Sequence, residues 1–297
     1  MIGRALGWIW VRLPRRALAA LFGGLAVLGY VFGVRRRVVL ANLRLAFPDK
    51  TEAERRAIAL ATYRHLGEMV PEFLRVPYLE AGELTRIFEY QGWENFERAR
   101  ALGKGVIACT GHFGHFDLLA AAHNLRGVPM TTISRKMGVG LWKGTRARAG
   151  VEEIYVHPGN TLSAAMKALR AGRVLGYVID QSEPNRNAIY PTFFGVPAAT
   201  AATPAVLSRR TGAPVLFTVS LPVGGGRHLV VIEGPLFPPE TGDREKDTLA
   251  FMQDLNDRLE AWVRRYPEQW YWLHRRWKRR KEAPAPASAL TGHEGAR

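Results

Sequence analysis

The chain has 297 residues, of which 47% are hydrophobic, so it is long enough for one large α/β unit and apolar enough to bury a core. Lys and Arg outnumber Asp and Glu by 42 to 26, and the formal net charge of +16 indicates an anionic partner: nucleic acid, an anionic membrane or an acidic protein. The single cysteine, Cys109, excludes a disulfide within the chain and fits a reducing compartment.

An uncharged apolar stretch, residues 17–34, stands near the N-terminus between arginines at 15–16 and 35–37. Its eighteen residues would span about 27 Å as a helix, slightly less than the hydrocarbon core of a bilayer. A signal peptide starts similarly, but here three arginines follow where a cleavage site would sit. We therefore expect residues 1–37 to form an uncleaved anchor, either spanning the membrane or lying in its interface. A buried hydrophobic helix is the alternative.

A helical region should follow, because Thr51 and Glu54 form a capping box and apolar residues then recur at helical spacing up to about Pro77. Beyond it, short apolar runs alternate with helical patterns, which predicts an α/β sheet with helices on both faces. The expected strands are 103–111, 128–135, 173–180, 213–222 and 227–236, and the expected helices are 116–125, 161–172, 200–212 and 245–267. Residues 281–297, rich in Ala, Pro and Gly, should be disordered, which leaves 38–280 for the main domain.

The triplet Gly-His-Phe occurs twice in succession, at 111–113 and 114–116, and Asp117 follows. Both histidines lie in a predicted strand-to-helix turn, at the end of a strand where α/β sheets gather their sites. On a helix, His115 and Asp117 would point about 200° apart. His112 precedes the helix, and the turn can fold its ring back over the first helical turn. His112 and Asp117 are therefore predicted to form a general-base dyad, in which the carboxylate orients the ring and stabilises its protonated form.

Other interpretations of this turn remain open. His112 could simply cap the turn. A metal site made of His112, His115 and Asp117 finds no further His or carboxylate cluster to complete it, so no metal is expected. The backbone amides near Gly111 and Gly114 are expected to stabilise an oxyanion, and both glycines permit a tight turn.

Two further segments supply candidate binding residues. Arg146 and Arg148 lie two residues apart between glycines, although a solvated basic loop would look the same. Asp180 and Gln181 directly follow an apolar strand, at the edge of the sheet where sites form. Asp180 could instead cap a turn.

Several segments resemble one family, in the same order. The motif TGHFGHFD resembles the His-x4-Asp/Glu block of the glycerolipid acyltransferase superfamily. The segments RRRVVLANLRLAFPD, ALRAGRVLGYVIDQ, PTFFGVPAATAATPAVLSRRTGAPV and LNDRLEAWVRRYPEQWYWLHRRWKRR resemble the opening, the middle and the ending of its lipid A biosynthesis branch, the late lauroyl/myristoyl acyltransferases. The resemblance covers about residues 1–280. It implies a mixed central sheet flanked by helices, with an N-terminal membrane-anchoring helix.

The resemblance implies transfer of an acyl chain from acyl carrier protein to a hydroxyl of a lipid A precursor, with no cofactor. It places the reaction on the cytoplasmic face of the bacterial inner membrane. His112 would take the proton from the hydroxyl directly, without an acyl-enzyme. The resemblance also implies an acceptor-binding arginine in the region of Arg146 and Arg148 and an acid at Asp180. The positive net charge suits the acidic carrier protein and a phosphorylated acceptor.

The acceptor remains open, because the region between Asp117 and Asp180 is somewhat short for the family; a lysophospholipid or a mannosylated lipid is the alternative. Residues 191–200 are expected to line the acyl pocket or to pack in the core. The aromatic and basic residues at 270–281 suggest a membrane interface. They could also stack on nucleic-acid bases, but no recognised nucleic-acid-binding motif accompanies them, so no nucleic-acid partner is expected. A non-catalytic basic binding protein is the second class considered.

Overall fold

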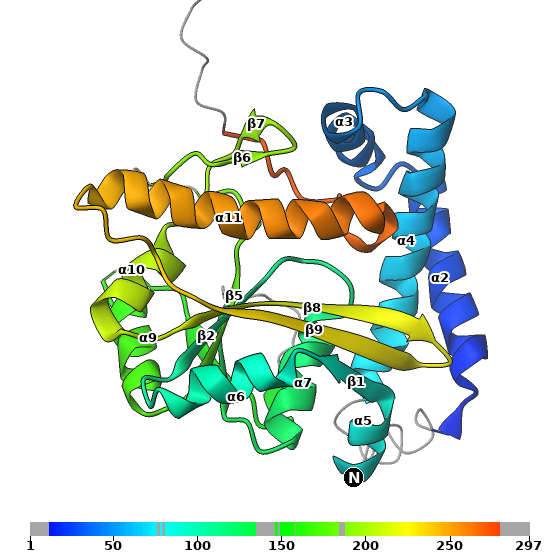
Figure 1. Ribbon diagram of the computed structural model, residues 1–297. Helices are drawn as coiled ribbons and strands as arrows, with labels where there is room; N and C mark the ends of the chain where they lie inside the picture. Colours follow the sequence, from blue (N-terminus) through cyan, green and yellow to red (C-terminus); the bar gives the residue numbers. More distant parts are fainter. Residues whose placement is uncertain are drawn as a thin grey trace, which may run out of the picture.

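The computed structural model of the protein describes residues 12–75, 78, 81–134, 146–147, 149–157, 159–183 and 188–279. Its centre is a seven-stranded sheet with helices on both faces (Figure 1). The strands of this sheet are β1 (Phe88–Gln91), β2 (Val106–Thr110), β3 (Met130–Ser134), β4 (Glu152–Tyr155), β5 (Val174–Val178), β8 (Val215–Gly224) and β9 (Arg227–Leu236). A separate small hairpin consists of β6 (Thr192–Phe193) and β7 (Val196–Pro197).

The strand order is β1-β9-β8-β2-β5-β3-β4. Strand β2 lies in the middle and runs parallel to both of its neighbours, β8 and β5. The β8–β9 pair is antiparallel, so β9 and β1 run against the other strands. The expected mixed central sheet is confirmed. Because β2 and β5 are parallel neighbours, the residues that follow them emerge at the same edge of the sheet.

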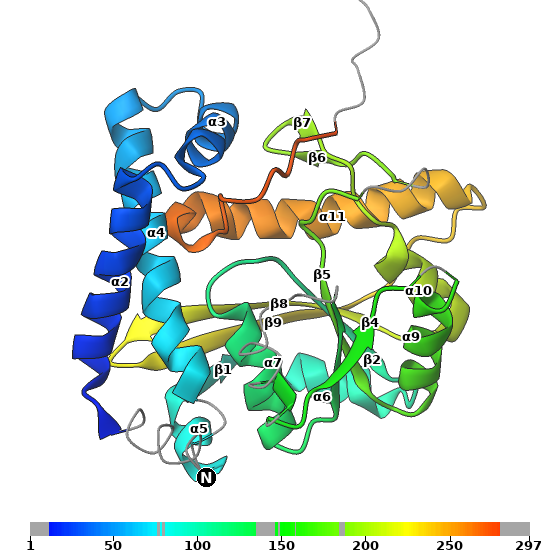
Figure 2. The ribbon, with the colours of Figure 1, turned by 180° about the vertical axis from the view of Figure 1, so that it is seen from behind.

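The helices form layers on the two faces of the sheet. Figures 1 and 2 show α11 lying along one face and α6 with α7 on the other. The helices are α2 (Arg15–Val31), α3 (Arg36–Ala46), α4 (Glu52–Arg75), α5 (Ala81–Ile87), α6 (Trp93–Ala101), α7 (Phe116–Leu125), α9 (Thr161–Arg170), α10 (Thr203–Thr211) and α11 (Arg244–Arg265). A short 3-10 helix, η2 (Pro267–Gln269), follows α11.

Alternate side chains of β2 pack into two hydrophobic cores, one on each face of the sheet. Ile107 and Cys109 belong to the core that α11, α10, α9 and α3 cover. Val106 and Ala108 contact the core on the α6 and α7 side. The central strand is therefore buried on both faces, which explains its uninterrupted apolar sequence.

Helix α2 packs lengthwise along α4 (Figures 1 and 2). The two backbones come so close at Gly67 that a Cβ there would lie 2.2 Å from the carbonyl oxygen of Phe22. Leu18 and Tyr30 are buried, and Tyr30 joins the main core. The opposite side of α2 and the turn after it expose large apolar side chains: Leu21, Leu25, Leu28, Val31, Phe32 and Val34.

The described helices include none that is, by itself, long and apolar enough to cross a membrane. Helices α2 and α3 meet the length and composition criteria only together, and the chain bends by 88° between them. The N-terminal anchor thus stays a prediction.

The aromatic residues near the C-terminus differ from the expected membrane interface. Trp270, Trp272 and Trp277 are at most 5% exposed and belong to the main core. Phe193 and Phe194, which were expected to line an acyl pocket or pack in the core, pack against these tryptophans. The expectation of an interfacial aromatic belt is wrong for these three tryptophans, because their rings pack in the core, whereas Tyr271 is 37% exposed. The predicted disordered tail lies outside the described residues.

Candidate active site

The turn between β2 and α7 carries both histidines, as the sequence predicts. Two of its glycines pack closely against neighbouring elements, and glycine is required at Gly114. A Cβ on Gly111 would lie 2.6 Å from Leu259 Cδ1, on α11. Gly114 has φ +55°, and a Cβ there would lie 1.8 Å from the carbonyl oxygen of Ser220 on β8. The glycines therefore let the turn lie directly against its neighbours.

His112 is paired with Asp180, which follows the neighbouring strand β5. Its Nδ1 lies 2.7 Å from Asp180 Oδ1, and its backbone N–H donates to Oδ2 at 2.7 Å. Trp270 Nε1 also donates to Oδ2, at 2.7 Å. Asp180 is only 2% exposed, so these donors replace the water that a buried carboxylate loses.

The expected hydrogen bond between His112 and Asp117 is not formed. Asp117 lies in the first turn of α7 and makes a close ion pair with Arg146, which also contacts Glu153 Oε1 at 3.0 Å. The partner of the ring comes instead from the adjacent parallel strand, whose end lies beside that of β2. The charge of Asp117 still acts on His112 from a distance and favours its protonated form.

Burial lowers the pKa of His112, but the charge and hydrogen bond of Asp180 outweigh burial, so the pKa is raised above its ordinary value. Although burial raises the pKa of Asp180, the His112 interactions lower it more, and Asp180 stays ionised. An ionised carboxylate at Nδ1 selects the tautomer that carries its proton there. Nε2 is then the nitrogen that can accept a proton, and its partner in the structure is the side-chain amide nitrogen of the exposed Gln181, 3.3 Å away.

The segment after α11 covers the other side of the turn. Phe113 and Trp270 form an antiparallel bridge, and Tyr271 N–H donates to the carbonyl of His112 at 2.9 Å. Gly114 N–H donates to the carbonyl of Gln269 at 3.0 Å. The amide of Gly114 is therefore engaged and is not available to a developing oxyanion, in contrast to the expectation.

The chain matches, over residues 1–279, the profile of a family described as bacterial lipid A biosynthesis acyltransferase. It belongs to this acyltransferase family. The chain is 28% identical over 286 residues to the lipid A biosynthesis palmitoleoyltransferase of Escherichia coli, a match that covers 94% of this chain and 90% of the relative. It is 29% identical over 287 residues to the lipid A biosynthesis lauroyltransferase of the same species, covering 95% and 92%.

Among solved structures, the chain is similar to the 1-acyl-sn-glycerophosphate acyltransferase PlsC of Thermotoga maritima. This match covers 81% of this chain and 97% of that chain, with 13% sequence identity and a TM-score of 0.39. The profile match confirms the family resemblance drawn from the motifs. The two Escherichia coli relatives are named for different acyl chains, palmitoleoyl and lauroyl.

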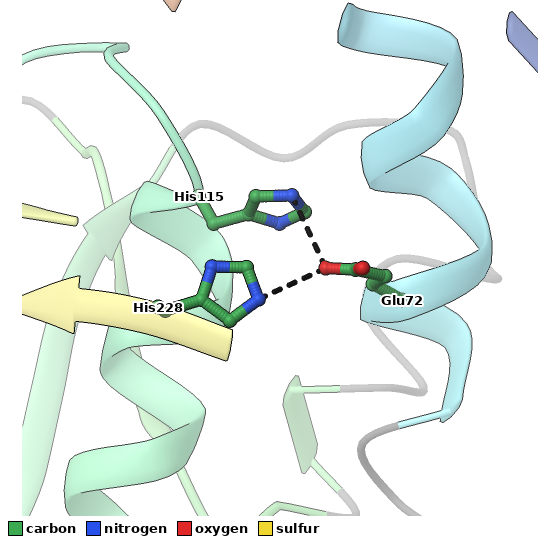
Figure 3. A group of neighbouring side chains, drawn as sticks. All are labelled: Glu72, His115 and His228. Carbon is green, nitrogen blue, oxygen red and sulfur yellow. Dashed lines mark ion pairs between the residues drawn. The ribbon is translucent and has the colours of Figure 1, made fainter. Parts of the chain in front are cut away.

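The second histidine of the doubled triplet, His115, lies in a different cluster (Figure 3). Its Nε2 is 3.3 Å from Glu72 Oε2, and Nε2 of His228 is 3.0 Å from the same oxygen. The expectation that no further His or carboxylate joins this turn is thus wrong for His115. Burial and the neighbouring imidazoles His228 and His65 hold the pKa of His115 far below its ordinary value, so its ring is neutral.

The sequence patterns did not predict several residues of the site. They place Trp270 at a membrane interface, and no local sequence pattern marks Glu72 or His228 as part of a site. Arg276, 1% exposed, donates to the carbonyl of Ala199 and to Thr200 Oγ1, both at 2.7 Å, and so holds the chain beside the site. Arg148, the alternative acceptor-binding arginine, lies outside the described residues.

Proposed function

We propose that this protein transfers an acyl chain from acyl carrier protein to a hydroxyl of a lipid A precursor, with His112 as general base. The observation that carries the proposal is the pairing of His112 Nδ1 with the buried carboxylate of Asp180, which leaves Nε2 to act on a substrate. The His112 side chain is 19% exposed, so a substrate hydroxyl can approach it. Membership of an acyltransferase family supports this reaction class.

The reaction proceeds in one transfer. His112 Nε2 accepts the proton of the acceptor hydroxyl as its oxygen attacks the thioester carbonyl carbon. The C–S bond then breaks, the carrier thiolate leaves, and the proton on His112 passes to it. The products are an ester and the free carrier thiol. Asp180 stabilises the protonated imidazole between these two steps.

A covalent acyl-enzyme has no part in this scheme. Cys109 is fully buried in the core, and burial raises the pKa of its thiol. A neutral thiol without access to substrate is a poor nucleophile. The thioester already supplies the free energy of transfer, so the reaction requires no cofactor.

The net charge and the exposed apolar surface support three proposed partners: the carrier protein, the acceptor and the membrane. The net charge of +16 favours an acidic carrier protein and an acceptor that carries phosphates. The exposed leucines of α2, with arginines before and after the helix, support attachment to an anionic membrane surface, and we place this surface on the cytoplasmic side of the inner membrane as part of the proposal. Arg146 is held by two carboxylates, so we assign it to positioning the start of α7. Of the two candidate arginines, Arg148 is then the one proposed to bind the acceptor.

The decisive experiment is an acyl-transfer assay with purified full-length protein in detergent. Acyl carrier protein charged with lauroyl, myristoyl or palmitoleoyl chains is the donor, and a lipid A precursor is the acceptor. We expect His112→Gln to lower kcat by about 10²–10⁴-fold, the usual contribution of a general base. His123→Gln is the matched control, because His123 is also buried, but its ring bonds to the carbonyl of Leu119 and packs against Tyr90 and Trp93, away from His112.

The outcomes separate the parts of the proposal. Equal turnover of wild type and His112→Gln would contradict the role of His112. Slow His112-dependent thioester hydrolysis without transfer would support the role of His112 but reject the lipid A precursor as acceptor. A lysophospholipid or a mannosylated lipid would then be tested as the acceptor. An absence of both reactions with every donor would favour a non-catalytic binding protein.

A further inference from the structure

Three potential metal ligands from three different elements meet beside the catalytic turn. Glu72 comes from the last turns of α4, His115 from the β2–α7 turn and His228 from the start of β9, and Figure 3 shows their side chains pointing toward one another. One ligand atom from each residue lies within 4.8 Å of the other two. None of these residues takes part in the proposed acyl transfer. The cluster therefore calls for its own explanation.

Hydrogen bonding does not account for the cluster. Nε2 of His228 lies 3.0 Å from Glu72 Oε2, yet neither atom has a hydrogen-bond partner within the described structure. Nδ1 of His228 also lacks one, although the residue is only 1% exposed. Buried polar atoms without partners cost about 1–3 kcal/mol each, so a second group that satisfies them is expected.

Two of the three spacings between the ligand atoms fit three corners of a tetrahedral cation site, whose fourth corner a water molecule would occupy. At metal–ligand distances of about 2.0–2.2 Å, the corners of a tetrahedron lie about 3.3–3.6 Å apart. The two distances to Glu72 Oε2, 3.0 and 3.3 Å, are close to this edge length. Two imidazoles and one carboxylate form a donor set that suits Zn²⁺ and disfavours Mg²⁺ and Ca²⁺, which prefer oxygen ligands.

We propose that Glu72, His115 and His228 bind one divalent transition-metal ion of the zinc class. The ion would tie α4 and β9 to the turn that carries His112, three residues before His115. Its role is structural positioning, and it takes no step in acyl transfer. A third imidazole, His65, stands edge-on to His115 with ring centroids 6.0 Å apart, so the immediate surroundings of the site are rich in nitrogen donors.

The test uses full-length protein stripped with a chelator and desalted. After incubation with ZnCl₂ and a second desalting, metal analysis should find about one zinc per chain. Titration with CoCl₂ should give the intense visible absorption of tetrahedral Co²⁺, which zinc then removes. X-ray absorption of the zinc-loaded wild type should show nitrogen and oxygen ligands that include two imidazoles.

Glu72→Gln and His228→Gln remove one ligand each at nearly constant volume and should weaken zinc retention at least about tenfold. His123→Gln, another buried histidine change, should retain zinc like the wild type. Zinc should also raise Tm in wild type and His123→Gln, but not in Glu72→Gln.

Wild-type protein that retains no zinc and gives no tetrahedral cobalt spectrum would overturn the proposal. So would full zinc retention by Glu72→Gln and His228→Gln, which would place the ion elsewhere. If both variants fail to fold by circular dichroism, the ligand set in the wild-type X-ray absorption spectrum decides alone. Neither result depends on acyl transfer, so the metal site can fail while the proposed function stands.

Discussion

Asp180 connects the two strands and the C-terminal segment that meet at the site. Its two oxygens accept from the ring of His112, from the backbone of the same residue and from the indole of Trp270. A carboxylate with three donors at 2.7 Å is fixed in one orientation, and it fixes the imidazole in turn. The tautomer of His112, and with it the identity of the basic nitrogen, therefore depends on this residue.

Asp180→Asn is predicted to lower kcat by about 10²–10⁴-fold while the substrate KM changes little. An amide has no charge to stabilise the protonated ring, and its NH₂ group can reverse the tautomer. The measurement is steady-state transfer with the charged carrier protein. Asp117→Asn is the comparison: loss of the Arg146 pair should affect activity less, and an equal loss in both variants would contradict the assignment of Asp180 as the ring's partner.

The pH dependence follows from the raised pKa of His112. The base works only when it is neutral, so kcat/KM should rise with pH as His112 loses its proton. Because Asp180 raises this pKa, the midpoint should lie above about 6.5, the ordinary value for histidine. A profile measured with a donor whose thioester is stable across the range tests this. A midpoint below that value would mean that burial prevails over Asp180.

The position of His112 was predictable from the sequence, but its partner was not. A glycine-rich turn after an apolar strand is a local signal, and it placed His112 in the turn after β2. The partner was sought within the same turn, at Asp117, where spacing can be assessed. Asp180 reaches the ring only because β5 lies next to β2 in the sheet, and that adjacency leaves no trace in local spacing.

At the level of elements, the β2–α7 turn depends on how closely it lies against β8. Gly114→Ala is predicted to cost several kcal/mol of unfolding free energy, because positive φ costs about 1–2 kcal/mol and the overlap with Ser220 adds about 1–3 more. Gly172→Ala is the matched control, since Gly172 has φ +72° but nothing within 4 Å of its Cβ position. Urea denaturation of both variants measures the difference, and equal losses would show that the turn relaxes freely.

The elements that the sequence did not reveal are mostly at the edges of the sheet. Strands β1 and β4, with sequences FEYQ and EEIY, are short and partly polar, so they lack the apolar run that marks a buried strand. The central strands β2, β5 and β8 carry that run and were expected at nearly their observed positions. Helices α5 and α6 flank β1 in the chain, and residues 81–101 as a whole show no clear helical or strand periodicity in the sequence.

For the whole molecule, attachment to a membrane should depend on the exposed side of α2. Leu25→Asn combined with Leu28→Asn is predicted to reduce binding to anionic vesicles at least about tenfold, since each buried leucine contributes about 1.5–3 kcal/mol. Co-sedimentation at fixed ionic strength is the measurement. Leu102→Asn, a change at an exposed leucine after α6, should leave binding unchanged. Unchanged binding in the α2 variant would instead indicate that charge alone holds the protein to lipid.

The segment that covers the catalytic turn has a consequence for how the protein is made. Asp180 lies 68 residues after His112, and Trp270 lies 90 residues after Asp180. A ribosome releases these three residues in that order, so a growing chain can pair His112 with Asp180 well before Trp270 exists to support the carboxylate. A chain cut short by a premature stop codon before Trp270 also lacks the segment that bridges to Phe113 and covers the turn. The turn therefore gains its full set of contacts only after Trp270 has been synthesised.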